Sequence, residues 1–182
     1  MFHSNTELLI DYWRQRKGSQ IAPARASINP ADLPSILPQL FILGRLRPGQ
    51  YAFRLVGGLV DDLHGGHLGG LDPLRLWKAP YRTALQLALE AARRQPEPLV
   101  MTCDGASFDA GGVALEITIA PLLGPSGEVD RMIGLYQPLS AVAALRGQPI
   151  ETLAIRSIVQ AGRADETFPR LKLATINGRQ IA

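Results

Sequence analysis

The sequence predicts an α+β fold in which helices cover one face of a five-stranded antiparallel sheet. Two strand-like segments with a short turn between them come first, a long helical segment follows, and three further strand-like segments complete residues 40–139. A hairpin, a helix and a three-strand meander in this order form one sheet with the helix packed on it. The composition agrees, because 46% hydrophobic and 19% charged residues among 182 are typical of a chain that buries a core.

A helix over residues 6–17 is the first predicted element. Ser4 and Glu7 stand at the spacing of a capping box, and Gly18 is a typical helix end. The connector that follows is rich in proline, which has no N–H group and therefore prevents a second long helix. Residues 1–39 are thus predicted to be an N-terminal helix with a connector.

This helix carries an apolar stripe. Leu9, Tyr12 and Trp13 recur at three- and four-residue steps, so they share one helix face. Such a stripe packs either on the chain's own core or on a second copy of the chain. We expect a homodimer and name these three residues as its candidate interface.

Residues 40–46 and 51–56 are predicted to be the strands of an antiparallel hairpin, with residues 47–50 as the turn. In the second strand, Arg54 lies on the face opposite to the aromatic side chains. An arginine there either pairs with a carboxylate, for which Glu116 on another strand is a candidate, or offers its charge to a ligand. Arg54 is therefore a candidate ligand-binding residue.

Residues 57–70 are rich in glycine and irregular, with a short helical turn over residues 59–63. They lack the spacing of a phosphate-binding loop, so the glycines are assigned to tight turns. His64 and His67 lie three residues apart, which can place both on one side of a turn. Both are candidates for ligand binding, whereas a metal site needs further ligands and none is predicted.

A second long helix is predicted over residues 80–95, because it starts at proline, a favoured first helical residue. Three strands follow, over residues 99–104, 112–123 and 131–138. Apolar residues alternate in the middle strand, which predicts one buried face and one less buried face. Residues 124–127 form a tight turn, so the last two strands are antiparallel neighbours.

Residues 140–182 are predicted to be an extension of this core. Residues 152–159 and 171–176 have the composition of strands, and Asn177-Gly178 is a typical hairpin turn. These strands are expected to add to a sheet edge, either of this chain or of a partner.

The order of the elements, with five short segments inside it, resembles a PAS domain, in particular a bacterial PAS-like subgroup that usually stands alone. The segments are LIDYW at residues 9–13, NPADLP at 29–34, LP at 37–38, YAFRLVG at 51–57 and HLGG at 67–70. The resemblance covers residues 7–139 and implies a PAS-like core over residues 40–139. It also implies the sheet order 2-1-5-4-3, curved around helices that enclose a small cavity. PAS domains bind a cofactor or metabolite in that cavity, or pair proteins, often through a flanking helix.

The implied cavity has six candidate ligand-binding residues. Trp77 and Tyr81 flank the start of the second long helix and either line the cavity or pack in the core. Cys103, alone on a strand, is expected to be a small core side chain. The cofactor is unknown, because most haem-binding relatives carry their axial histidine on the long helix, where this chain has none, and the cysteine motif of flavin photosensors is absent. The six candidates are Arg54, His64, His67, Trp77, Tyr81 and Cys103.

These observations predict a sensory or protein-interaction module without catalysis. It is expected to act through ligand binding or dimerisation, and to pass its signal on through a partner protein or through residues 150–182. A small-molecule enzyme that uses His64 or His67 as its base is the main alternative. A weak nucleic-acid binder is the second, although the net charge of +3 comes from scattered basic residues. No apolar run approaches the ~20 residues of a membrane span, and a single cysteine is typical of a reduced compartment, so a cytoplasmic location is expected.

Overall fold

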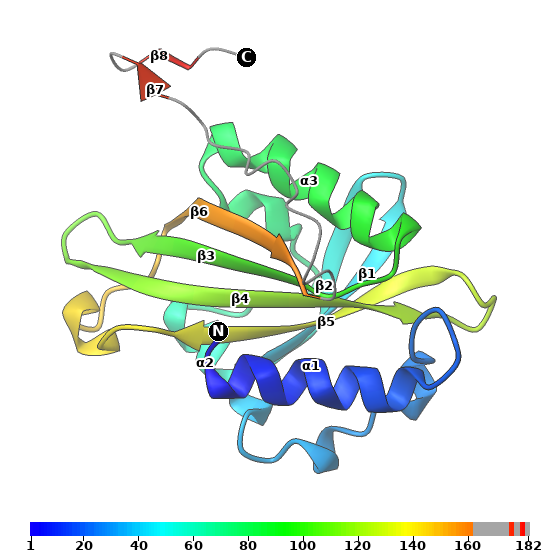
Figure 1. Ribbon diagram of the computed structural model, residues 1–182. Coiled ribbons are helices and arrows are strands. Elements are labelled where there is room, and N and C mark those ends of the chain that lie inside the picture. The colour runs from blue at the N-terminus through cyan, green and yellow to red at the C-terminus, as the bar shows by residue number, and fades with distance from the viewer. Residues whose placement is uncertain (162–174, 177–178, 181–182) are drawn as a thin grey trace.

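The computed structural model describes residues 1–161, 175–176 and 179–180. Its centre is a six-stranded antiparallel sheet in the order β2-β1-β5-β4-β3-β6 (Figure 1). The predicted order 2-1-5-4-3 is confirmed, and β6 adds a sixth strand beside β3. The strands are β1 (Leu40–Arg47), β2 (Gln50–Val56), β3 (Leu99–Ala106), β4 (Gly112–Leu123), β5 (Val129–Pro138) and β6 (Thr152–Gln160).

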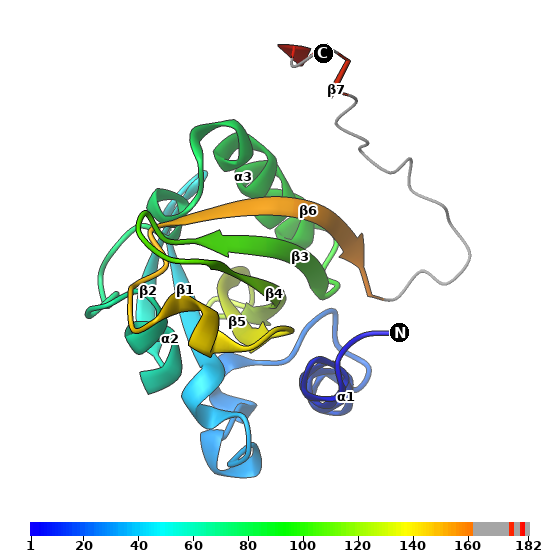
Figure 2. The same ribbon diagram turned by 90° about the vertical axis from the view of Figure 1, so that its left-hand side faces the viewer.

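The long helices lie on opposite faces of the sheet (Figures 1 and 2). The short helix α2 (Gly58–Leu63) and the long helix α3 (Ala79–Arg94) cover what we call the inner face, and α1 (Ser4–Lys17) covers the outer face. The inner face is the predicted helical side, while α1 and the connector behind it form a second cover. No helix in the described part of the chain is long and apolar enough to cross a membrane.

The central strand β4 has the predicted bounds but is buried on both faces. All residues from 115 to 122 are buried. Their inner side chains pack under α2 and α3, and their outer side chains pack under α1 and the connector. The prediction of a less buried face is therefore wrong, because the alternation in this strand does not reveal that a second layer covers it.

Helix α1 begins earlier than predicted and has a different cap. His3, and not Ser4, caps the helix, because the Nδ1 atom of His3 accepts a hydrogen bond from the backbone N–H of Asn5 at 3.1 Å. Gly18 ends the helix as predicted, with a φ of 53° that only glycine adopts at little cost.

The apolar stripe of α1 packs on the outer face of its own sheet. Leu9, Tyr12 and Trp13 are 0%, 8% and 1% exposed. The indole N–H of Trp13 donates to the carbonyl oxygen of Pro121 at 2.7 Å, and the hydroxyl of Tyr12 donates to Asp32 at 3.0 Å. The prediction that these three residues form a dimer interface is therefore wrong, because they are buried against the chain's own sheet. A second copy could contact them only if α1 detached from the sheet.

The C-terminal extension adds its first strand to this chain's own sheet. β6 lies antiparallel to β3, with a shift of register between Thr102 and Cys103. Of the predicted strand 171–176, β7 (Thr175–Ile176) is described, and it pairs with β8 (Arg179–Gln180). The rest of that strand and the predicted Asn177-Gly178 turn lie outside the described residues.

Candidate functional site

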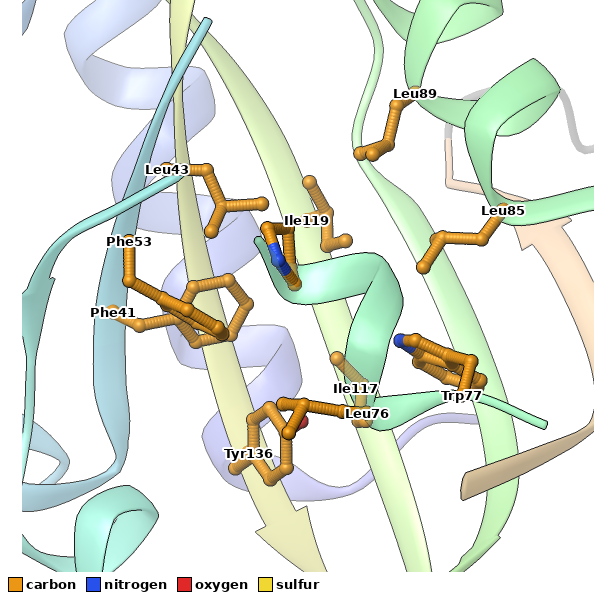
Figure 3. Close-up of a pocket in the computed structure, with 11 residues that line it drawn as sticks. Phe41, Leu43, Phe53, Leu76, Trp77, Leu85, Leu89, Ile117, Ile119 and Tyr136 are labelled. Carbon is orange, nitrogen blue, oxygen red and sulfur yellow. The ribbon is translucent and has the colours of Figure 1, made fainter. Parts of the chain in front are cut away.

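A small cavity of about 20 Å³ lies between the inner face of the sheet and its helical cover (Figure 3). A volume of this size holds roughly one water molecule. The sheet contributes the side chains of Phe41, Leu43, Phe53, Ile117, Ile119 and Tyr136. The cover contributes Pro73, Leu76, Trp77, Leu85 and Leu89, from the 3₁₀ turn Pro73–Leu76, the residue after it and α3.

The lining of the cavity is almost entirely hydrocarbon and aromatic carbon. Among the lining residues, the side chains that carry a polar atom are Trp77, with its indole nitrogen, and Tyr136, with its hydroxyl oxygen. An unpaired charge transferred into such surroundings loses far more solvation energy than burial returns. The chemistry of the cavity therefore favours uncharged, apolar contents.

Three aromatic rings hold one side of the cavity in a fixed arrangement. The ring of Phe41 packs edge-on against Phe53 at 5.7 Å between centroids and against Tyr136 at 5.6 Å. Edge-to-face geometry places the positive edge of one ring on the negative face of the next, which stabilises each pair. Gly134, opposite Phe41 in β5, provides the space that the ring of Phe41 occupies.

His64 lies beside the cavity and not in its lining. The Nδ1 atom lies 2.9 Å from the carbonyl oxygen of Ile150, and a carbonyl only accepts, so Nδ1 carries the hydrogen. The Nε2 atom is buried without a hydrogen-bond partner among the described residues, and the ring packs edge-on against Tyr136 at 5.7 Å. Burial lowers the pKa of His64 below its ordinary 6.5 and outweighs the opposing effects of Ile150 and Asp61. The side chain is thus held in its neutral form.

Cys103 and Tyr136 share this apolar environment. Cys103 is 1% exposed on the inner face, and burial raises the pKa of its thiol, with the charge of Asp104 as a second cause. Burial also raises the pKa of Tyr136. Cys103 therefore has a protonated thiol and packs as a small apolar side chain, as expected.

The two candidate histidines do not converge on one site. The side chain of His67 is 81% exposed, and its Nδ1 atom lies 3.2 Å from Asp61, whereas the ring of His64 is turned inward to Ile150. Within the part of the chain that the structure describes, no group of three His, Cys, Asp or Glu side chains is placed to hold a metal ion. Although they are three residues apart, His64 and His67 therefore lie in two different environments, one turned inward and one exposed to solvent.

Arg54 lies on the outer face, away from the cavity. Its exposed side chain runs over Gly44, where a Cβ atom would clash with it. Two strands separate β2 from β4, so Arg54 does not reach Glu116, which instead accepts a hydrogen bond from the backbone N–H of His3 at 2.9 Å. The predicted ion pair is wrong for this reason. Of the remaining candidates, Trp77 lines the cavity, and half-buried Tyr81 packs against the inner core without lining it.

One functional feature that the sequence did not suggest is the carboxylate of Glu90 on α3. It accepts hydrogen bonds from the hydroxyl of Tyr51 at 2.9 Å, the N–H of Gly49 at 3.3 Å, Arg45 at 3.3 Å and Arg93 at 3.1 Å. Burial alone would raise the pKa of Glu90, but these partners together lower it to about 2. Glu90 thus ties the C-terminal half of α3 to the β1–β2 hairpin.

The curved antiparallel sheet and the cavity under its helical cover define a class of small sensory domains. A family model described as a PAS domain matches residues 1–137. This chain belongs to the PAS domain family. No curated protein matches it.

Solved structures with a similar fold include light-oxygen-voltage domains. One, whose mechanism was probed with a flavin analogue, is 16% identical with a TM-score of 0.48, over 64% of this chain and 87% of that chain. A LOV protein of Rhodobacter sphaeroides is 12% identical with a TM-score of 0.46, over 65% and 72%. An RNA-binding light-oxygen-voltage receptor is 17% identical with a TM-score of 0.44, over 68% of this chain and 36% of the receptor.

Proposed function

We propose that this chain is a PAS sensory module whose inner cavity binds a small, uncharged and mostly apolar molecule. The lining supports this most directly, because its side chains are hydrocarbon or aromatic except for the polar tips of Trp77 and Tyr136. Apolar contacts supply the affinity in such a pocket, and a few polar atoms fix the orientation of the ligand. The two polar tips suit a ligand with one hydrogen-bonding group.

The size of the cavity means that a metabolite needs the helical cover to move. About 20 Å³ is far less than the roughly 300 Å³ of a typical ligand pocket. A flavin suits this cavity poorly, because the polar edges of its three fused rings would face hydrocarbon. Cys103, the only cysteine, is buried on β3 and does not line the cavity.

The proposed module signals by contact and does not catalyse a reaction. The geometry supports a role without catalysis, since neither candidate base lines the cavity: Nε2 of His64 is buried beside it, and His67 stands in solvent. We propose that the module pairs with a second copy or with a signalling protein. The apolar stripe of α1 is buried and is therefore not the contact surface. Whether the purified chain forms a homodimer is tested first by light scattering.

A cavity-filling substitution tests the ligand proposal. The full chain is screened by thermal shift against a panel of small apolar molecules, because a ligand that binds the folded state raises Tm. Leu85→Phe fills the cavity, and Leu87→Phe, at a site 66% exposed on the same helix, is the matched control. We expect a shift that Leu85→Phe abolishes and Leu87→Phe retains. If no molecule shifts the wild type, ligand binding is refuted and protein pairing remains.

A further inference from the structure

The chain that leads into β6 is bonded to both helices that cover the inner face, α2 and α3. The N–H of Ile150 donates to the carbonyl oxygen of Leu63 at 2.7 Å, and Nδ1 of His64 donates to the carbonyl oxygen of Ile150 at 2.9 Å. Three residues later, the carbonyl oxygen of Leu153 accepts from the N–H of Lys78 at 3.0 Å. The start of β6 is therefore attached to the end of α2 and to the cap of α3.

Trp77 belongs to the cavity and to this attachment at the same time. Its side chain lines the cavity and is 4% exposed, and its backbone forms an isolated parallel bridge with Leu153. Arg82 donates to the carbonyl oxygen of Trp77 at 2.9 Å. A displacement of the indole therefore acts directly on the backbone that holds Leu153.

The helical side of the cavity is the side that can yield. The sheet side chains of the lining come mainly from β1, β4 and β5, each of which has a bonded strand on both sides. Helix α3 is pinned near its C-terminal end, where Glu90 binds the β1–β2 hairpin and Gln86 donates to the carbonyl oxygen of Gly49 at 2.9 Å. An occupant larger than the cavity will therefore move the N-terminal end of α3, which carries Trp77 and Lys78.

β6 is well placed to respond to such a movement. Among the described residues it is an edge strand beside β3, and the register shift between Thr102 and Cys103 divides its ladder into two parts. The first part, Thr152 to Ile155, is the one attached to the cavity cover. An edge strand, which is bonded on one side only, opens locally at a lower free energy than a central strand. β6 also lies beyond residues 1–137, the region that the family model matches.

We propose that β6 is the output element of the cavity, so that displacement of Trp77 loosens Thr152 to Ile155 from β3. The state of the cavity is then read at β6, on the edge of the sheet. The inference rests on the proposed ligand-binding function for its input. It adds a specific route, through the Lys78 to Leu153 hydrogen bond.

Hydrogen exchange of the full chain, followed by mass spectrometry, tests this route without a ligand. Trp77→Leu alters the cavity at the attached side, and Phe53→Leu alters it at the sheet side without contact to β6. With rates normalised to the amides of β4, we expect Trp77→Leu to speed exchange over residues 152–155 about tenfold, and Phe53→Leu to leave it unchanged. Equal effects of the two variants, or none from Trp77→Leu, overturn the proposal. If Trp77→Leu does not fold, Trp77→Phe is measured in its place.

A second variant isolates the hydrogen bond. Lys78 has φ −56° and Trp77 has ψ 143°, both of which suit proline at residue 78, so Lys78→Pro removes the N–H with little strain. In this background we expect Trp77→Leu to add no further exchange over residues 152–155. The same increment in both backgrounds overturns the route. This experiment and the ligand screen test different claims. A screen without a thermal shift refutes ligand binding, whereas the same effect of Trp77→Leu in both backgrounds refutes the coupling of Trp77 to β6.

Discussion

The ring of Phe41 lies directly against the α-carbon of Gly134, its cross-strand partner in β5. Any Cβ atom at residue 134 would enter the ring. Phe41 also contacts Phe53 and Tyr136, so this glycine sets the position of the aromatic side of the cavity.

Gly134→Ala is expected to destabilise the protein by about 1–3 kcal/mol, the usual cost of overpacking a core. Urea unfolding followed by circular dichroism measures the change. The cost should shrink in combination with Phe41→Leu, because the smaller side chain vacates the space. Gly58→Ala is the control, since a Cβ atom there meets nothing within 4 Å. Equal costs in the two glycine variants would contradict the close contact.

Glu90→Gln is expected to weaken the junction between α3 and the β1–β2 hairpin by about 1–3 kcal/mol at neutral pH, as for hydrogen bonds to a charged group. The pKa of Glu90 falls from 4.5 to about 2 on folding, so its contribution is complete above about 4.5 and disappears as the pH falls toward 2. Urea unfolding of both proteins across this range should show the two stabilities converge. Glu97→Gln should show a much smaller difference, because the Glu97 carboxylate makes a single long contact in the described part of the chain, with Lys17 at 3.9 Å.

His64 is expected to make the protein less stable as the pH falls below 6.5. Because burial lowers its pKa in the folded state, the unfolded chain binds a proton there that the folded chain does not. His64→Asn retains an N–H donor for Ile150 without a titrating group. Between about pH 7 and about pH 5.5, the Tm of this variant should therefore fall less than the Tm of the wild type. His67→Asn should behave as the wild type. The same decline in His64→Asn would show that other groups cause it.

Trp13→Ala is expected to lower the free energy of unfolding by about 3–5 kcal/mol, the usual cost of truncating a buried tryptophan. Because Trp13 packs on its own sheet and donates to Pro121, the loss should be the same at every protein concentration. A residue at a dimer interface would instead give a Tm that rises with concentration. Thermal unfolding over a hundredfold range of concentration decides between the two, and a concentration dependence that Trp13→Ala removes would restore the dimer interface.

Much of the secondary structure is predictable because it depends on local pattern. The bounds of β4, Gly112–Leu123, follow from alternation and from the glycines and prolines at its ends, and those of α3 follow from Pro80 and the apolar repeat. The C-terminal strand Thr152–Gln160 is predictable in the same way. The PAS sheet order comes from resemblance rather than from any local pattern.

The candidate site was predictable only in part. Trp77 was named and lines the cavity, whereas Arg54 was named and lies on the opposite face. Tyr136, Ile117 and Phe41 were missed, although strand alternation marks them as apolar, because alternation does not say which apolar side chains border a space. No sequence signal joins Glu90 to Tyr51, since a separation of 39 positions matches no helical or strand repeat.

The apolar stripe of α1 separates what the sequence determines from what the tertiary structure decides. Helical periodicity by itself determined that Leu9, Tyr12 and Trp13 share a face that must be buried, because apolar area is driven out of water wherever it lies. It left the partner open, since the hydrophobic effect has no direction and a second copy satisfies it as well as the chain's own sheet. In the tertiary structure the stripe packs on the chain's own sheet, because the outer faces of β4 and β5 present apolar side chains to it. The carbonyl oxygen of Pro121 also accepts a hydrogen bond from the indole of Trp13.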